Sequence, residues 1–76
     1  NPATSNTQVS IYSASNAMGM VKLLDMSGRT VKVIKIQYTP GYNNVELSLD
    51  QLAQGAYQVN VYANDVLLKS LKLNKM

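Results

Sequence analysis

The sequence contains no cysteine, histidine, tryptophan or phenylalanine, and these absences exclude several classes of function. Without cysteine the chain can form no disulfide, no thiolate nucleophile and no zinc finger. Without histidine it lacks the usual general base near neutral pH and the commonest metal ligand. Because no ordinary nucleophile–base pair can be assembled from what remains, the composition predicts a protein that is not an enzyme, needs no cofactor and acts by being bound.

Negative charge is scarce as well. The four carboxylates are spread along the chain, and a calcium site would need six to eight oxygens, usually from several carboxylates. The seven lysines and arginines are also dispersed, whereas a nucleic-acid site would cluster them with stacking rings. We therefore predict no metal site and no nucleic-acid partner, and we interpret the basic residues as a solvated face.

Long apolar runs are missing too. No stretch of about 18 apolar residues could span a bilayer, and residues 1–7 lack the charged start and apolar centre of a signal peptide. The chain does not begin with methionine, so we expect a piece of a longer protein in which residues 1–7 end a linker. The 76 residues, 46% of them hydrophobic, suffice for one small folded domain.

Hydrophobic residues recur with a period of two. In Ala56–Tyr62, for example, Tyr57, Val59 and Val61 alternate with polar residues, which is typical of antiparallel strands with one buried face. Short strands separated by frequent turns predict an all-β fold, a sandwich or small barrel. We expect six strands, at residues 8–12, 20–25, 30–36, 45–50, 56–63 and 66–73, and a seventh near residues 14–18.

Two expected strands break this period. In residues 30–36 the apolar phase changes between Val33 and Ile34, and in residues 66–73 it changes at Leu68. A β-bulge would restore burial at such a break. A strand buried on both faces is an equally good explanation.

Turn residues separate the strands. Asp25-Met26-Ser27-Gly28 predicts a hairpin, since an aspartate can accept backbone hydrogen bonds and a glycine can adopt the left-handed conformation. Asn64-Asp65 predicts a tight hairpin, because both residues tolerate a positive φ. Pro40-Gly41 indicates a longer loop from Gln37 to Asn44.

Residues 50–55 are too few for a helix and predict one turn, with Leu52 filling the core and Gly55 releasing the chain into the next strand. We interpret Tyr57 as a core or corner residue whose hydroxyl finds a partner. Three methionines are interpreted as gap-fillers around one end of the sandwich: Met18, Met20 and Met26.

Four segments in order resemble a known family. They are Asn1-Pro2-Ala3-Thr4, Leu24-Asp25-Met26-Ser27-Gly28-Arg29, Leu52-Ala53-Gln54-Gly55-Ala56-Tyr57 and Lys72-Leu73-Asn74-Lys75. Their order and spacing resemble the type A C-terminal sorting domain of the type IX (Por) secretion system of Bacteroidetes-type bacteria. That family has a Pro-Asn-Pro-Ala-like start, an Asp-x-x-Gly-[Arg/Lys] turn, a Leu-x-x-Gly-x-Tyr segment and a basic end. The resemblance covers essentially the whole chain, although the first proline is absent and Met76 follows the last lysine.

The resemblance implies an immunoglobulin-like antiparallel β-sandwich at the C-terminus of a cargo protein. The cargo crosses the inner membrane and the periplasm, and the sorting domain then directs it through the outer-membrane translocon. A sortase-like peptidase typically removes the domain, and the cargo is released or attached to anionic lipopolysaccharide at the cell surface. The implied partners are the translocon, the peptidase and the N-terminal cargo domain of the same chain. For the isolated domain we add a strand-exchanged homodimer as an expectation.

The resemblance also implies that the C-terminal end is read by the secretion machinery. The recognition residues predicted there are Lys69, Lys72, Leu73 and Lys75. The alternative is a solvated edge, because lysines on an edge strand discourage sheet-to-sheet pairing, although a strand with unpaired backbone groups can also add to a partner's sheet. The other motif positions are predicted to be structural: Asn1, Pro2, Asp25, Gly28, Gly55 and Tyr57.

A second hypothesis is an accessory carbohydrate-binding or adhesion module. Four tyrosines predicted to be exposed could stack on sugar rings: Tyr12, Tyr38, Tyr42 and Tyr62. Tyr38 and Tyr42 flank Pro40-Gly41 and are the best candidates.

Overall fold

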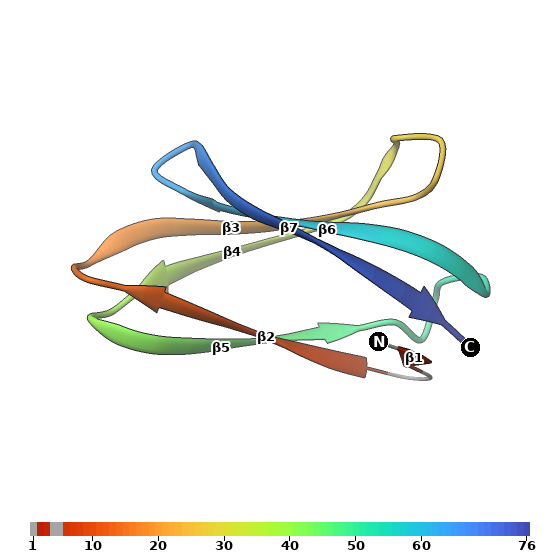
Figure 1. Ribbon diagram of the computed structural model, residues 1–76, viewed down its shortest axis with the longest axis horizontal. Coiled ribbons are helices and arrows are strands. Elements are labelled where there is room, and N and C mark those ends of the chain that lie inside the picture. Colours follow the sequence, from red (N-terminus) through yellow and green to blue (C-terminus); the bar gives the residue numbers. More distant parts are fainter. Residues whose placement is uncertain (1, 4–5) are drawn as a thin grey trace.

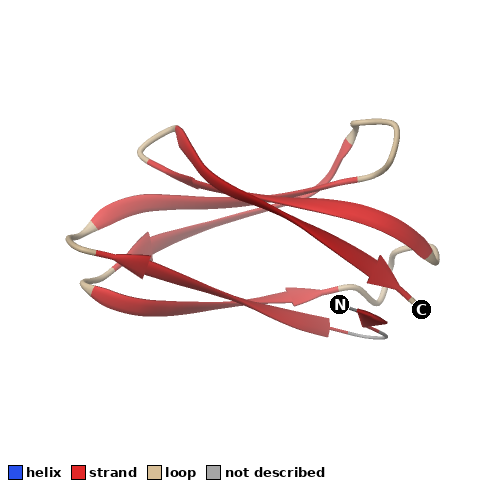
Figure 2. Ribbon diagram, viewed as in Figure 1, coloured by secondary structure: helices blue, strands red, loops and turns tan. Residues whose placement is uncertain are grey.

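The computed structural model describes residues 2–3 and 6–76, and this part of the chain consists of strands and short connections without a helix. The all-β prediction is thus confirmed (Figure 2). The strands are β1 (Pro2–Ala3), β2 (Asn6–Ser13), β3 (Ala17–Leu24), β4 (Thr30–Tyr38), β5 (Gly41–Ser48), β6 (Gly55–Ala63) and β7 (Val66–Lys75).

The strands form two layers, as the predicted sandwich requires (Figure 1). One sheet has five strands in the order β1-β7-β6-β3-β4, and the other pairs β2 with β5. All neighbours are antiparallel except β1, which runs parallel to the end of β7 and pairs Pro2 with Asn74 and Ala3 with Lys75. The two-residue β1 therefore brings the beginning of the chain beside the C-terminal strand.

The core lies between the sheets and follows the alternation of apolar residues. β6 buries Tyr57, Val59 and Val61, as their period of two predicts, and β3 buries Val21 and Leu23. The remaining buried residues are Val9, Ile11, Tyr38, Val45, Leu47, Leu49 and Leu73. Leu52 packs against this cluster and its amide donates to Leu49 O, which agrees with the predicted turn.

At two places the connections between strands differ from the prediction. Residues 14–18 form no strand of their own, because β3 begins at Ala17 and continues through the segment expected from residue 20. The predicted long loop from Gln37 to Asn44 is also wrong, since only two residues separate β4 from β5. Asn43 fastens this connection: its side-chain Oδ1 accepts from Thr39 N, and its Nδ2 donates to Thr39 O and Ile11 O.

Both strands with a phase break contain a β-bulge, but only the bulge of β7 lies at the break, since that of β4 precedes the break between Val33 and Ile34. Opposite β6 the register shifts at Leu68, and opposite β3 it shifts at Val31, so each is an extra residue on its strand. The bulges do not restore burial, because Leu68 stays half exposed. Val33 is 46% exposed on the outer face of β4, so the alternative of a strand buried on both faces is wrong. The five-stranded sheet consequently has an outer face with apolar side chains.

The methionine interpretation is wrong. Met18 is exposed, and Met26 is 76% exposed in the turn between β3 and β4, at the opposite end of the sandwich. A buried tyrosine takes the space near Met18 instead. The ring of Tyr38 lies over Gly19, whose missing side chain leaves room for it.

Candidate functional site

The C-terminal strand β7 lies near one edge of the five-stranded sheet and carries the predicted recognition residues. It pairs with β6 along one side, whereas on its other side only Asn74 and Lys75 are paired, with β1. Within the described residues, the outer edge of β7 from Val66 to Leu73 therefore has no strand partner. A groove of about 160 Å³ follows this edge between β7 and β2.

Two of the predicted lysines already have partners. Lys69 reaches across the sandwich and donates from Nζ to Ser10 O of β2 at 3.0 Å. Lys75 donates to Leu52 O in the turn before β6 at 2.7 Å. Because the second sheet has only two strands, it does not cover every inward position of the five-stranded sheet. A long lysine side chain at such an uncovered position can lay its apolar stem over the core and extend its ammonium group to a carbonyl.

The other two predicted residues differ from each other. Leu73 is 4% exposed and packs in the core, so its side chain is not presented to a partner. Lys72 is exposed and points to the outer face, since it pairs with Gln58 between the inward-facing neighbours of β6.

The Asp25 turn is built as the sequence predicts. Asp25 Oδ1 accepts from the amides of Ser27 at 2.9 Å and Arg29 at 3.0 Å, and Oδ2 accepts from Arg29 Nε at 3.2 Å. Gly28 has a φ of 87°, the left-handed conformation that the turn needs. The hydrogen bond from the Arg29 amide is the main cause that lowers the pKa of Asp25 below its ordinary value of 3.8. The turn is thus stabilised by the ionised carboxylate.

The Leu-x-x-Gly-x-Tyr segment also forms a local unit. Gly55 starts β6 with a positive φ of 147°, and the Tyr57 hydroxyl donates back to Ala53 O at 2.6 Å. Of the motif positions at the start, Asn1 lies outside the described residues, and Pro2 belongs to β1. The described motif residues therefore form turns, strand ends and core.

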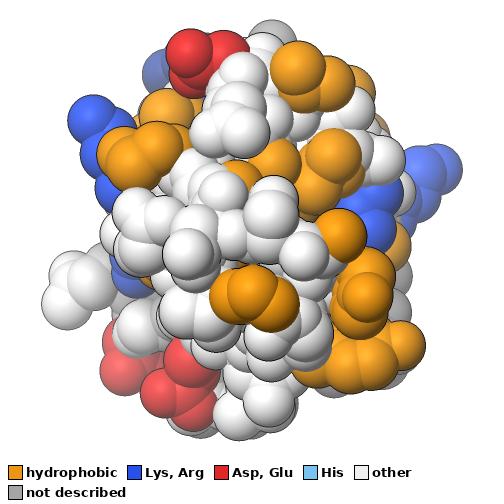
Figure 3. Space-filling view, turned by 90° about the vertical axis from the view of Figure 1, so that its left-hand side faces the viewer, with side chains coloured by type: hydrophobic (Ala, Val, Ile, Leu, Met, Phe, Trp, Pro, Cys, Tyr) orange, Lys and Arg blue, Asp and Glu red, His pale blue; other side chains and the backbone are white. Residues whose placement is uncertain are grey.

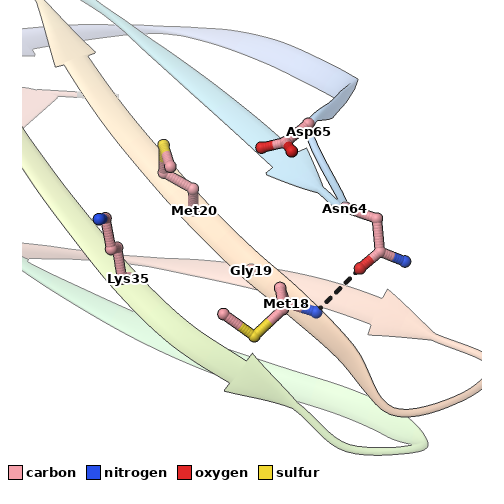
Figure 4. A pocket seen from close by; sticks show the side chains of 6 residues that line it. All are labelled: Met18, Gly19, Met20, Lys35, Asn64 and Asp65. Carbon is pink, nitrogen blue, oxygen red and sulfur yellow. Dashed lines mark hydrogen bonds between the residues drawn. The ribbon is translucent and has the colours of Figure 1, made fainter.

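The predicted tight hairpin at Asn64-Asp65 is confirmed, and it lies beside a surface hollow that was not predicted. Asn64 and Asp65 have φ values of 49° and 67°, as the tight turn requires. Asn64 is tied to β3, because its amide donates to Met18 O at 2.9 Å and its Oδ1 accepts from Met18 N at 3.2 Å. Beside it lies a hollow of about 380 Å³ (Figure 4).

Sequence reasoning missed two lysines of the outer face. Lys22 lies in β3 with its ammonium 5.2 Å from the ring centre of Tyr62, a cation–π contact. Lys35 of β4 pairs with Met20 and lines the hollow. Alternation within β3 was the available signal, because Lys22 lies between two buried residues of the strand.

The tyrosines do not form the expected sugar-binding set. Tyr38 is fully buried and its hydroxyl donates to Tyr62 O at 3.0 Å, so the prediction that its ring is exposed is wrong. Burial raises the pKa of the Tyr38 hydroxyl above its ordinary value of 10.0. Tyr12 and Tyr42 are exposed and pair across β2 and β5, with ring centres 5.3 Å apart and planes at 66°.

In residues 2–3 and 6–76, no three carboxylates gather where they could hold a metal ion. The same residues form no helix with the length and hydrophobicity needed to cross a bilayer.

Comparison with known proteins gives one match. The family model described as "Secretion system C-terminal sorting domain" matches residues 1–73, which is nearly the whole chain. Neither the curated proteins nor the solved structures include a match.

Proposed function

Since the chain belongs to the family of secretion system C-terminal sorting domains, which act as signals for type IX secretion, we propose that it carries a cargo protein from the periplasm through the outer-membrane translocon. In this proposal a sortase-like peptidase then removes the domain. The cargo is released from the cell or joined to lipopolysaccharide at its surface. The domain itself contributes no chemistry and works as a folded recognition element.

The match over residues 1–73 is the observation that carries this proposal. The structure supports the proposal, because two of the matched segments form connections that are held by their own hydrogen bonds. The Asp25 turn and the Tyr57 hydroxyl each fasten a connection with bonds inside the same segment. A signal that is read as a shape needs such rigid connections, because ordering a loose loop on binding costs affinity.

The C-terminal lysines enter the proposal with different roles. Lys72 is offered to the machinery, because its side chain is exposed on the outer face. Lys69 holds β7 against β2 of the opposite layer, and Lys75 holds the end of β7 to the turn before β6, each through a hydrogen bond to a carbonyl. Their loss would act on recognition through the position of β7.

An export assay tests the proposal. Residues 1–76 are appended to a fluorescent reporter with a signal peptide, in a bacterium that has a type IX system. We expect the reporter outside the outer membrane and an immunoblot product that has lost the tail. A reporter that stays in the periplasm, with the same distribution when residues 69–76 are deleted, would contradict the proposal. In a strain without the peptidase, the exported reporter should keep its tail.

The strand-exchanged homodimer of the isolated domain stays a prediction. As a second form of self-association, we infer that the isolated domain pairs edge to edge with a second copy through the free edge of β7. The exposed apolar residues Val66 and Leu68 and the unpaired backbone of this edge support that inference. Sedimentation at rising concentration should reveal a dimer, and a strict monomer would refute this inference.

Carbohydrate binding is the second candidate, favoured only by the exposed pair Tyr12 and Tyr42. Glycan-array binding that disappears in a Tyr12→Ala/Tyr42→Ala variant would support it. An array without any signal would leave export as the proposed function.

A further inference from the structure

The lysines are distributed unevenly between the two sheets. All six lie on three strands of the five-stranded sheet: Lys22, Lys32, Lys35, Lys69, Lys72 and Lys75. The described strands of this sheet contain no aspartate or glutamate. Of the four carboxylates, Asp25 and Asp65 lie in its turns, Glu46 lies on β5, and Asp50 follows β5.

Three of these lysines already have partners within the domain. Lys69 donates to Ser10 O of β2 and Lys32 of β4 donates to Ser48 O at the end of β5 at 2.8 Å, whereas Lys75 donates to Leu52 O in the connection from β5 to β6. These three ammonium groups lie at the margins of the sandwich, and their hydrogen bonds are intramolecular. These hydrogen bonds give the inward-facing lysines Lys32, Lys69 and Lys75 a structural role.

The other three lysines have a different environment. Lys22, Lys35 and Lys72 occupy outward positions of β3, β4 and β7, and none is joined to a carboxylate in the described part of the chain, where the single ion pair links Arg29 to Asp25. The sheet register sets the lysines apart along a diagonal. Lys35 lies opposite Met20, Lys22 lies two residues further along β3, and Lys72 lies one row beyond, in line with Gln58.

Apolar side chains share this outer face. Met20, Tyr62 and Leu67 stand in one row across β3, β6 and β7, with Met20 paired to Tyr62 and Tyr62 paired to Leu67. At the end of the row lies the hollow of about 380 Å³. Its lining residues are Met18, Gly19, Met20, Lys35, Asn64 and Asp65.

The hollow is held open by the backbone around it. Its rim at Asn64 is fixed by the two hydrogen bonds between Asn64 and Met18 of β3 (Figure 4). Figure 3 views the molecule from the end at which this hairpin lies, and it shows hydrophobic side chains in patches, with basic side chains on both flanks. A preformed hollow that is largely apolar and has a polar rim suits a single anchoring side chain.

We propose that the outer face of the five-stranded sheet docks on an acidic protein surface of the secretion machinery, which places one apolar side chain in the hollow. This inference rests on the proposed function and names the surface that the machinery reads. Three lysines without ion-pair partners attract carboxylates, and such complementarity governs the rate and specificity of association. The apolar row of Met20, Tyr62 and Leu67 and the hollow supply the part of the interface from which water is excluded on docking.

The rim of the hollow favours a protein over an anionic lipid bilayer. Asp65 stands beside the hollow, where a flat layer of lipid phosphates would lie against its carboxylate. A protein surface can instead place a hydrogen-bond donor opposite Asp65 and carboxylates opposite Lys22 and Lys35.

The test compares two reporters with equal net charge. One tail carries Lys22→Gln, Lys35→Gln and Lys72→Gln, and the control tail carries three exposed changes away from this face: Asn6→Asp, Ser10→Glu and Gln51→Glu. Each set lowers the formal net charge by three units, from +3 to 0. We expect export of the lysine variant to fall about tenfold, because three charge contacts are lost, and export of the control to stay within about twofold of wild type.

The outcomes separate the inference from the proposed function. A wild-type tail that is not exported would overturn the proposed function. A wild-type tail that is exported, together with a lysine variant exported equally well or a control impaired as strongly, would overturn only the docking surface. If the purified domain binds phosphatidylglycerol vesicles and the lysine substitutions abolish this binding, a lipid is the partner and the protein assignment is wrong. Should the triple variant melt at a clearly lower temperature than wild type, Lys35→Gln and Lys72→Gln are compared singly by the same criterion.

Discussion

The contact between Gly19 of β3 and Tyr38 of β4 offers a quantitative test of the packing. A Cβ atom added at position 19 would overlap atoms of the Tyr38 ring. The ring cannot easily move away, because it is fully buried and its hydroxyl donates to Tyr62 O at 3.0 Å. Gly19 is not among the residues with positive φ, so its backbone itself would accept alanine.

We predict that Gly19→Ala lowers the free energy of unfolding by about 1–2 kcal/mol. Overpacking a filled core costs about 1–3 kcal/mol. Replacing glycine by alanine at a compatible backbone position stabilises the folded state by about 0.4–1 kcal/mol, because it reduces the conformational entropy of the unfolded chain. In a domain of this size, whose core supplies roughly 3–5 kcal/mol, the difference is easily measured by urea unfolding with far-ultraviolet circular dichroism.

The opposite sign would refute the reasoning. If the ring did not occupy this space, Gly19→Ala would stabilise the domain. A double-mutant cycle with Tyr38→Leu is the control, because the cost of the alanine should largely disappear once the ring is gone. An alanine cost that is unchanged in the Tyr38→Leu background would contradict the proposed contact.

Three further predictions concern ionisable groups. Because the pKa of Asp25 is lowered in the folded state, its contribution to stability should be complete above pH 3.8 and lost as the pH falls below that value, so Asp25→Asn should flatten the acid limb of a pH–unfolding curve. Because the pKa of Tyr38 is raised, its contribution should be complete below pH 10.0 and lost above it, so Tyr38→Phe should lose less stability than wild type between neutral and strongly alkaline pH. Lys75→Met should lower the free energy of unfolding by about 1 kcal/mol through loss of its hydrogen bond, and Lys72→Met should change it by less than about 0.5 kcal/mol. Equal effects of these two lysine substitutions in urea unfolding would contradict their assigned roles.

Local patterns in the sequence were sufficient for much of the fold. The alternation in β6 identifies Tyr57, Val59 and Val61 as core residues, because burial of one strand face depends only on its period. The Asp25 and Asn64 turns were also predictable, since their hydrogen bonds and φ values arise within a few residues.

Features that join distant segments were not predictable in this way. The Pro40-Gly41 pattern predicts that Tyr38 lies in a loop, although Tyr38 continues the phase of Ile34 and Ile36. Its burial depends on the space above Gly19, and that space exists only once β3 and β4 are paired. Local spacing alone cannot show such a contact.

The division of the lysines has the same origin. Alternation along β7 places Lys69 and Lys72 on opposite faces, but it does not show that Lys69 reaches Ser10 of β2. That hydrogen bond joins strands of different sheets, so it depends on how the two layers are stacked. That Lys22, Lys35 and Lys72 share the outer face therefore follows only from the pairing of β3, β4, β6 and β7 in one sheet.

The central claim is that these residues direct export. The most direct measurement is the fraction of a signal-peptide-bearing reporter found outside the outer membrane, with and without residues 1–76, in cells with an intact or deleted type IX translocon. The account predicts a large extracellular or surface fraction only when the tail and the translocon are both present. Equal fractions with and without the tail, or export that persists without the translocon, would contradict it.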